Sequence, residues 1–291
     1  MEILQLRYFL ELANRQHVSK TAEYLHISQP SLSSTIKKME DELGVPLFIR
    51  NGRGIVLSEY GKVYREYAED ALLALDNGRT IMKEMRGERE TTFKLGMLSP
   101  YVWADLISAF EKKYPEININ RYSYEGNMYI SGLLDNRIDL YIGGINVTND
   151  PRLHYDTLYI DQMVLLVNKK NPLSKLKEVD LRICENERYI NLGEDTNLQQ
   201  FIDTLYSAAN FKPNVIMECD YTLRDQMVID NHGVSITTKK ATDQLKSREV
   251  RAVKIVYPPY KRRLGLVWRK KAYQTYAQKK FIEFADNFYK G

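Results

Sequence analysis

Cysteine is scarce in this sequence, with Cys184 and Cys219 the only two among 291 residues. A chain of this length without a cysteine framework is not a disulfide-stabilised secreted domain, and it suits a reducing compartment. Apolar segments lie near both thiols, and no feature nearby indicates a lowered pKa. Two inert thiols are therefore expected, with a redox-sensing pair as the alternative.

Long apolar runs are also missing. No stretch approaches the roughly 20 apolar residues that cross a bilayer, and the N-terminus lacks the basic start and apolar core of a signal peptide. Charge of one sign is not in excess, because 42 Lys and Arg oppose 38 Asp and Glu, for a net charge of +4. These features predict a cytoplasmic protein, and any nucleic-acid affinity must come from placement and dimerisation.

Signals of catalysis are absent as well. The four histidines are scattered, without a spaced partner for zinc or a nucleophile elbow. No Gly-rich phosphate loop follows an expected strand, and carboxylate pairs occur only as helix-surface charge. The sequence therefore predicts a non-enzyme with no metal and no cofactor.

What the chain does contain is a helix-turn-helix pattern in residues 19–53. Ser19 is expected to cap a short helix that runs to about His26. Ser28 is expected to cap a second helix, with Pro30 in its first turn, where a missing N–H costs little. The tight turn between the two helices fits the geometry of DNA-binding helix pairs.

The second helix has two contrasting faces. An apolar stripe recurs at helical spacing and ends at Gly44; it comprises Leu32, Ile36, Met39 and Leu43. The other face carries small or hydrogen-bonding side chains and two cations, namely Gln29, Pro30, Ser33, Ser34, Lys37 and Lys38. Such groups can pair with base edges or phosphates in a major groove. An ordinary solvated face is the alternative, but serine is a middling helix former for that purpose.

A hairpin is expected directly after this helix. Leu47–Arg50 and Ile55–Leu57 are predicted strands, and Asn51-Gly52 is a strong turn signal. Arg50 and Arg53 flank the tip, where they can reach phosphate or an adjacent minor groove. The whole pattern predicts a winged helix-turn-helix that binds duplex DNA.

Residues 3–61 resemble the DNA-binding domain of the LysR-type transcriptional regulators. The matching features at fixed spacing are Phe9, Thr21-Ala22-Glu23-Tyr24-Leu25, Ser28-Gln29-Pro30-Ser31-Leu32-Ser33, Ile36, Met39-Glu40, Leu43-Gly44, Leu47-Phe48, Arg50 and Leu57-Ser58 with Gly61. The resemblance implies that Gln29, Pro30, Ser31, Ser33, Ser34 and Lys37 face DNA, with Arg50 in the wing.

One long helix is expected from Ser58 to about Gly87. Its apolar and small residues alternate spacings of three and four, as in a heptad seam: Leu57, Tyr60, Tyr64, Tyr67, Ala71, Ala74, Gly78, Ile81 and Met85. A dimer seam is favoured over packing on the same chain, because charges cover the other faces. The resemblance also implies a dimerising linker helix here.

From Thr92 onward, strands and helices are expected to alternate, which predicts a parallel α/β sheet covered on both faces. The expected strands are Phe93–Leu98, Ile117–Tyr122, Leu140–Gly144, Met163–Asn168, Tyr189–Leu192, Val215–Glu218, Val234–Thr237 and Gly265–Arg269. The expected helices are Val102–Tyr114, Met128–Asn136, Leu198–Ala209, Leu223–Asn231 and Gln274–Phe288.

This half resembles the effector domain of the same family, a two-lobed α/β domain similar to a periplasmic binding protein. The chain is expected to cross out of the first lobe near Asp161 and back near Leu264. The expected domains are a winged helix-turn-helix at 1–58, a linker helix at 59–88 and an effector-binding domain at 89–291. Its first lobe comprises 89–161 and 265–291, and its second lobe 162–264.

A ligand cleft is expected where the carboxyl ends of the strands meet. The resemblance implies that this cleft is lined by Ser99, Tyr101, Met128, Asn146, Thr196 and Asn197. Tyr221 is expected to line it as well. Ser99 and Thr196 are expected to hold an anion at helix N-termini, with simple helix caps as the alternative. No arginine is evidently aimed at the cleft, and the aromatic and methionine side chains favour a partly apolar effector over a carboxylate.

A basic run, Lys261-Arg262-Arg263, lies near the end of the chain with Arg251 and Lys254 as neighbours. It is expected to be a solvated face, with a second contact to bent DNA as the alternative. The sequence as a whole predicts a regulator that binds promoter DNA as a dimer or tetramer and responds to a small-molecule effector. RNA polymerase is a candidate partner. Rival readings are a constitutive architectural DNA-binding protein and a solute-binding or enzymatic domain with an incidental helical N-terminus.

Overall fold

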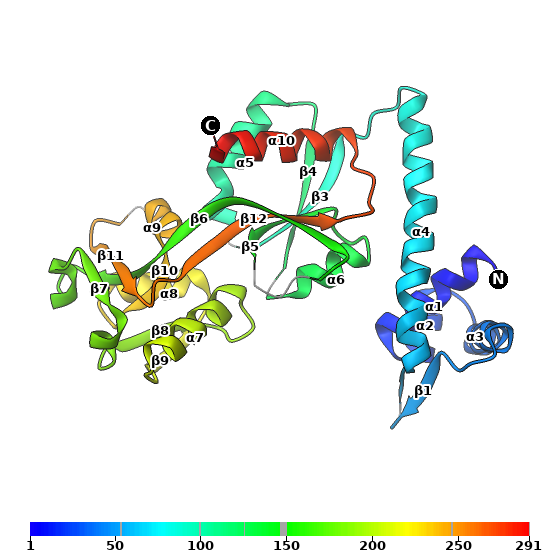
Figure 1. Ribbon diagram of the computed structural model, residues 1–291, viewed down its shortest axis with the longest axis horizontal. Helices are drawn as coiled ribbons and strands as arrows, with labels where there is room; N and C mark the ends of the chain where they lie inside the picture. Colours follow the sequence, from blue (N-terminus) through cyan, green and yellow to red (C-terminus); the bar gives the residue numbers. More distant parts are fainter. Residues whose placement is uncertain (53, 99, 125, 146–149, 246, 291) are drawn as a thin grey trace. The chain divides into compact units, whose positions relative to one another are not determined.

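The computed structural model describes residues 1–52, 54–98, 100–124, 126–145, 150–245 and 247–290. The chain forms two compact units (Figure 1). The first comprises Met1–Glu88 and Lys271–Tyr273, and the second comprises Arg89–Lys270 and Gln274–Gly291.

The first unit packs three helices and a hairpin around one small core. Its elements are α1 (Ile3–Arg15), α2 (Val18–Tyr24), α3 (Gln29–Leu43), β1 (Phe48–Asn51), β2 (Gly54–Leu57) and α4 (Glu59–Met85). The ring of Phe9 lies at the centre, with edge contacts to Phe48 at 5.6 Å and Tyr64 at 5.3 Å. Apolar side chains from α1, α2, α3 and α4 surround it. The predicted winged helix-turn-helix is confirmed.

The ends of α3 follow from local chemistry. The Ser28 hydroxyl accepts the Ser31 backbone N–H at 3.3 Å, and Gly44 ends the helix at φ +72°, so both predictions are confirmed. The predicted cap of α2 is wrong. His17 occupies the cap position, and Ser19 lies inside the helix, because the helix begins at Val18.

The hairpin turn also differs from the prediction by one residue. Asn51 pairs with Gly54 inside the hairpin, so the turn does not begin at Asn51. Gly52 adopts φ +58°, in the left-handed region that glycine enters at little cost. Arg53, expected at this tip, lies outside the described residues.

Helix α4 begins in direct contact with the root of the hairpin. The Ser58 hydroxyl accepts the Gly61 N–H at 3.0 Å and donates to the Pro46 carbonyl at 2.6 Å. Near its other end, Glu84 accepts a hydrogen bond of 2.6 Å from the Tyr273 hydroxyl. The helix is therefore fixed to this unit both at its start and by the short segment Lys271–Tyr273.

The second unit is built on one long mixed sheet. Its strands are β3 (Thr92–Met97), β4 (Asn118–Ser123), β5 (Leu140–Gly144), β6 (Leu153–Asn168), β7 (Glu178–Asp180), β10 (Ser235–Thr238), β11 (Val250–Tyr257) and β12 (Lys261–Arg269). They follow the order β4-β3-β5-β12-β6-β11-β7, with β10 also paired to β6. A parallel pair, β8 (Arg188–Leu192) with β9 (Asn214–Cys219), stands beside it.

The expectation of a parallel sheet holds for only part of this unit. Strand β3 is parallel to β4 and β5, whereas β12 is antiparallel to β5 and β6. The first half of β6, the whole of β7 and β11, and the short helix α9 (Lys239–Gln244) were not predicted. Their polar side chains interrupt the apolar runs on which the strand predictions depended.

Strands β6 and β12 run through both lobes (Figure 1). β6 pairs with β12 as far as Gln162 and with β10 and β11 from Met163 onward. The return strand begins at Lys261 and not at the predicted Gly265, since Arg262 and Arg263 pair with Asp161 and Ile160. The start of this strand was not predicted, because its first residues are charged and the prediction relied on runs of apolar residues.

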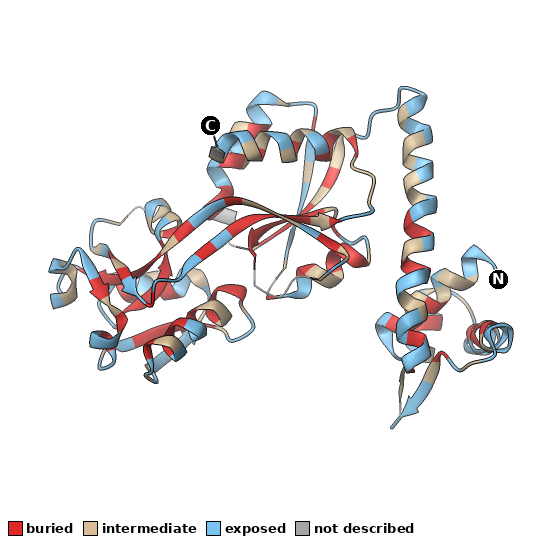
Figure 2. Cartoon of the chain, viewed as in Figure 1, coloured by how far each residue is buried: buried red, intermediate tan, exposed pale blue. Residues whose placement is uncertain are grey.

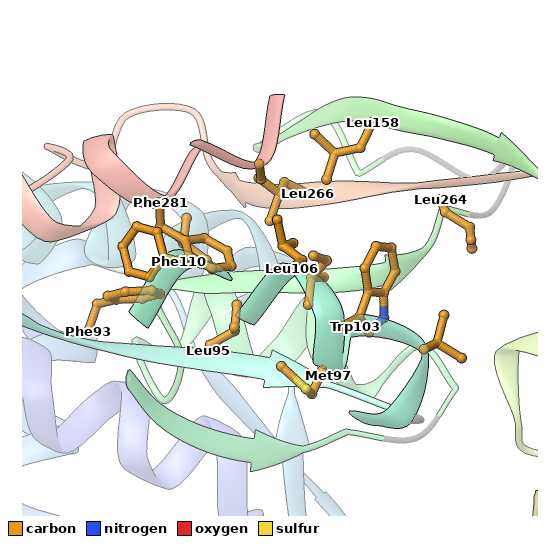
Figure 3. Packing of buried hydrophobic residues seen from close by; sticks show 14 of the residues in the cluster. Phe93, Leu95, Met97, Trp103, Leu106, Phe110, Leu158, Leu264, Leu266 and Phe281 are labelled. Carbon is orange, nitrogen blue, oxygen red and sulfur yellow. The ribbon is translucent and has the colours of Figure 1, made fainter. Parts of the chain in front are cut away.

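The remaining helices are α5 (Ala104–Lys113), α6 (Met128–Leu134), α7 (Asn197–Ala209), α8 (Tyr221–Ile229) and α10 (Tyr276–Lys290), with 3₁₀ turns η1 (Pro100–Trp103), η2 (Pro172–Lys175) and η3 (Leu181–Cys184). In the first lobe, Phe93, Phe110 and Phe281 bring β3, α5 and α10 together (Figure 3). A separate cluster around Tyr189 and Leu205 forms the core of the second lobe.

Replacing Gly61 with alanine tests the contact at the start of α4. The added methyl would lie 2.0 Å from the Leu47 carbonyl oxygen, so backbone must move. We expect the first unit to lose about 1–3 kcal/mol of unfolding free energy, measured by urea titration with circular dichroism. Gly78→Ala on the same helix is the matched control, because its methyl meets nothing within 4 Å and should add roughly 0.5–1 kcal/mol. Equal effects of the two variants would contradict the close packing at Gly61.

Candidate functional site

The outward face of α3 carries the side chains that the sequence assigned to DNA. All are exposed: Gln29, Pro30, Ser31, Ser33, Ser34, Lys37 and Lys38. Leu32, Ile36 and Met39 face the core, whereas Leu43 is exposed, so the buried stripe ends one turn earlier than expected. The α3 face is therefore a polar surface backed by a rigid core.

Gln29 is held in place by the preceding helix. The Ser19 hydroxyl donates to Gln29 Oε1 at 2.9 Å, which leaves the amide NH₂ of this exposed side chain as a donor for another group. An amide whose orientation is fixed loses less entropy when it contacts a base. The sequence had treated Ser19 as a helix cap and so missed its contact with Gln29.

The cations at this end of the unit have no competing acid. Within the described chain, no carboxylate forms an ion pair with Lys37, Lys38 or Arg50, and Arg50 lies exposed on β1. By contrast, Arg65 on α4 pairs with Glu69 at 2.7 Å. The charges of α3 and the hairpin are therefore available for phosphate groups.

Helix α4 has exposed positions along its length (Figure 2), and several of them carry apolar side chains on one face, which we call the apolar stripe. Tyr60 is 59% exposed, Tyr67 is 70% exposed, and Val63, Leu75, Met82 and Met85 lie exposed along the same helix. Among the predicted seam residues, Tyr64 instead packs against Phe9 within its own unit. A stripe of apolar side chains at helical spacing is a surface suited to a partner helix.

The second unit contains a cavity of about 60 Å³ between its lobes. The first lobe contributes Leu98, Val102, Trp103, Tyr141, Gly143 and Gly144, and the second contributes Asn197, Leu198, Tyr221, Thr238 and Ala241; Arg262 and Leu264 come from β12, which crosses between the lobes. A molecule bound here touches both lobes at once.

Arg262 is the charged residue of this cavity. It is only 5% exposed, and its guanidinium donates from Nη1 to the Asn197 carbonyl oxygen at 3.2 Å and from Nη2 to Asn197 Oδ1. Burial lowers the pKa of Arg262 from its ordinary value, against opposing influences from neighbouring tyrosines and Asp161. Gly144 makes room for it, since a methyl there would lie 2.0 Å from Nη2.

Two sequence expectations are therefore wrong at Arg262. The run 261–263 is not a uniformly solvated patch, and an arginine does point into the cleft. Successive side chains on a strand point to opposite faces, so Arg262 enters the cavity while Arg263 stays exposed and donates to the Thr157 hydroxyl at 2.8 Å. Recognising 261–269 as one strand would have revealed this alternation.

Asp161 is a second buried charge, close to where β6 leaves the first lobe. Its carboxylate accepts the Lys240 N–H at 3.1 Å and the Gln162 N–H at 2.8 Å, and burial raises its pKa. The Lys240 ammonium reaches Asp105 at 3.4 Å, which joins α9 of the second lobe to α5 of the first. These contacts hold the two lobes together beside the cavity.

The other predicted effector residues are distributed unevenly. Asn197 and Tyr221 line the cavity. Thr196 caps α7 by accepting the Gln199 N–H at 3.2 Å, and Met128 is 61% exposed at the start of α6; neither is among the described lining residues of the cavity. Tyr101 belongs to η1. Ser99 and Asn146 lie outside the described residues.

Neither cysteine has the environment of a reactive thiol. Burial raises the pKa of Cys184 to about 12, and it also raises the pKa of Cys219. Both therefore remain protonated near neutral pH, and the thiolate is the reactive form. In the described ranges, no cluster of three or more candidate metal ligands occurs, and no helix is long and apolar enough to cross a membrane.

A winged helix-turn-helix with an exposed polar face, joined to a two-lobed domain with a cavity between its lobes, defines a ligand-responsive DNA-binding regulator. Family models agree: residues 3–62 match the bacterial regulatory helix-turn-helix protein of the lysR family, and residues 86–289 match the LysR substrate binding domain. The chain belongs to the LysR family of transcriptional regulators.

Similar proteins cover the whole chain. The HTH-type transcriptional regulator YybE of Bacillus subtilis (strain 168) is 30% identical over 275 residues, covering 93% of each chain. Among solved structures, full-length OxyR from Pseudomonas aeruginosa matches with TM-score 0.70 at 21% identity, covering 99% of this chain and 94% of that one. Full-length CbnR in complex with its target DNA matches with TM-score 0.58 at 21% identity, covering 99% of both.

Lys37→Ala tests the α3 face. A lost phosphate contact should weaken binding on all sequences and reduce the salt slope by about 1, whereas a lost base contact should cost about 1–3 kcal/mol on the preferred site alone. Both are measured by fluorescence anisotropy of labelled duplexes at several salt concentrations. Lys83→Ala, at the far end of α4, is the control. If the two variants bind alike, Lys37 does not contact DNA.

Proposed function

We propose that this LysR-type regulator contacts promoter DNA through the α3 face and the hairpin. The contacting residues are Gln29, Pro30, Ser31, Ser33, Ser34, Lys37 and Lys38 on α3, with Arg50 and Arg53 in the hairpin. The exposure of the described members of this set and the unpaired cations among them support the assignment. Ser19 orients Gln29 for base contact.

The active form is a dimer, or a tetramer built from two dimers. The exposed apolar stripe of α4 supports a helix-to-helix contact between two copies. A dimer places two recognition helices in successive major grooves, roughly 34–36 Å apart. Because the net charge of the chain is small, a single DNA-binding domain offers few phosphate contacts. Two such domains in a dimer are therefore important for affinity.

The cavity between the lobes is the effector site. Since its lining comes from both lobes, a bound molecule has a different affinity for open and closed arrangements and can shift the equilibrium between them. Asn197 and Tyr221 contact the effector, and Ser99, Tyr101 and Asn146 remain candidates at the first-lobe strand ends. Thr196 acts as a helix cap.

The protein acts by binding and not by catalysis, in the cytoplasm, with RNA polymerase as the partner of its promoter-bound form. Membership of a family of transcriptional regulators supports these assignments. One observation carries the proposal: the same chain has a polar helix face suited to DNA and a cavity lined by both lobes of its second unit. The competing function is that of a constitutive architectural protein without a ligand response.

A footprint on the DNA upstream of its own gene separates these functions. We expect two protected half-sites, and a protection pattern that changes when a cellular metabolite pool is added. The full-length protein is used, with bovine serum albumin as the control for nonspecific effects of the pool. Uniform, salt-sensitive protection that no metabolite alters would favour the architectural protein.

Tyr67→Glu tests the dimer stripe. A carboxylate at the centre of an apolar helix contact costs desolvation energy, so we expect dimer dissociation to become at least tenfold easier, a change of about 1.4 kcal/mol. Sedimentation equilibrium measures it. Lys83→Glu places the same charge on another face of α4 and should leave the dimer intact. An unchanged association constant for Tyr67→Glu would remove the stripe from the interface.

A further inference from the structure

We infer that the cavity between the lobes takes a small organic monoanion, a short-chain carboxylate whose charged group pairs with Arg262. This inference rests on the proposed effector role of the cavity and adds the chemical class of the ligand. It replaces the sequence-based preference for an effector without a carboxylate.

The first argument is the incomplete pairing of Arg262. A guanidinium has five N–H donors. The hydrogen bonds of Arg262 go to the carbonyl oxygen and Oδ1 of Asn197, both neutral acceptors. Within the described chain, no carboxylate lies within ion-pair distance of it. Asp161 acts on the guanidinium only through space and is itself engaged by N–H groups, so a carboxylate ligand supplies the direct bidentate contact that this buried guanidinium lacks.

The second argument is an unused donor next to Arg262. Asn197 is 2% exposed, and its side-chain Nδ2 is buried without a hydrogen-bond partner in the described part of the chain. Because Oδ1 accepts from Arg262, the orientation of this amide is fixed and its NH₂ group remains to donate. Asn197 is also the first residue of α7, a helix of 13 residues whose N-terminal dipole favours an anion.

The charge of the ligand follows from the groups around Arg262. Asp161, opposite Arg262 in the strand register, is engaged by the N–H groups of Lys240 and Gln162 and by the Thr238 side chain. The Lys240 ammonium is directed to Asp105. Among the described lining residues, Arg262 is therefore the one cation, and Asp161 offsets part of its charge from a distance, which favours a ligand with one negative charge over a ligand with two.

The rest of the ligand must be apolar and short. Away from Arg262 and Asn197, the apolar lining of the cavity includes Leu98, Val102, Trp103, Leu198 and Leu264. Its volume of about 60 Å³ is several times the roughly 10–15 Å³ needed for one water, and a chain of a few heavy atoms fills it. A chain of two to four carbons fits this description, and inorganic phosphate does not, because it has no apolar part.

Isothermal titration of the full-length protein with matched pairs of acids and amides tests this inference. The probes are acetate, propionate and butyrate, each compared with its amide, together with succinate and inorganic phosphate. We expect at least one monocarboxylate to bind at least tenfold more tightly than its amide, and more tightly than succinate or phosphate. Each pair has nearly the same shape, so the difference reports the charge.

The variant Arg262→Gln should abolish this preference for acid over amide. Arg263→Gln, the same substitution at the exposed neighbour, should retain it. Gly144→Ala provides an independent variant that keeps every charge but pushes its methyl into the guanidinium, and it should weaken acid binding at least tenfold. Circular dichroism confirms that each variant is folded.

Three results would overturn the inference: no acid of the series binds, the amides bind as well as the acids, or Arg262→Gln and Arg263→Gln behave alike. None of these touches the proposed function, which fails instead if the metabolite pool leaves the promoter footprint unchanged. A footprint that responds to metabolites while the acid series does not bind would retain the regulator and discard the carboxylate.

Discussion

Strands β6 and β12 are shared by both lobes of the second unit, and the rest of that unit depends on this shared pair. One stretch of β6 pairs with β12 in the first lobe, and the next stretch pairs with β10 and β11 in the second. The two strands are paired where the lobes meet, at Lys261 with Gln162 and at Arg262 with Asp161, so the lobes are joined by paired backbone and not by a loop alone. Arg262 and Asp161 are opposite each other in this pair, so the charged group that lines the cavity lies where the two lobes join.

The first unit depends on a different constraint, the junction between the hairpin and α4. Ser58 both caps the helix and binds the carbonyl of Pro46, and Gly61 allows helix and loop backbones to touch. Phe9 then packs between the hairpin and α4 through Phe48 and Tyr64. The direction of α4 and the presentation of the α3 face are thus set by the same few contacts.

Much of the fold could be predicted from the sequence, because its signals were local. Ser28 and Gly44 mark the ends of α3 by their own chemistry, and β5 matches its predicted range, Leu140–Gly144. The errors arose where tertiary pairing decides the outcome. Ser19 looked like a cap but bonds to Gln29, and Tyr64 looked like a seam residue but packs on Phe9. Arg262 looked like surface charge, because nothing local reveals that Gly144 and Asn197 leave a space for it.

The segment Lys271–Tyr273 complicates any attempt to divide the protein into exchangeable modules. It follows β12 directly in the chain, yet it belongs to the first unit, where Tyr273 binds Glu84 and Asn77 on α4. A fragment ending at Glu88 would therefore lack part of its own structure. A chimaera that joins this DNA-binding half to a foreign sensor has to bring those three residues along, although they lie some 180 positions later in the sequence.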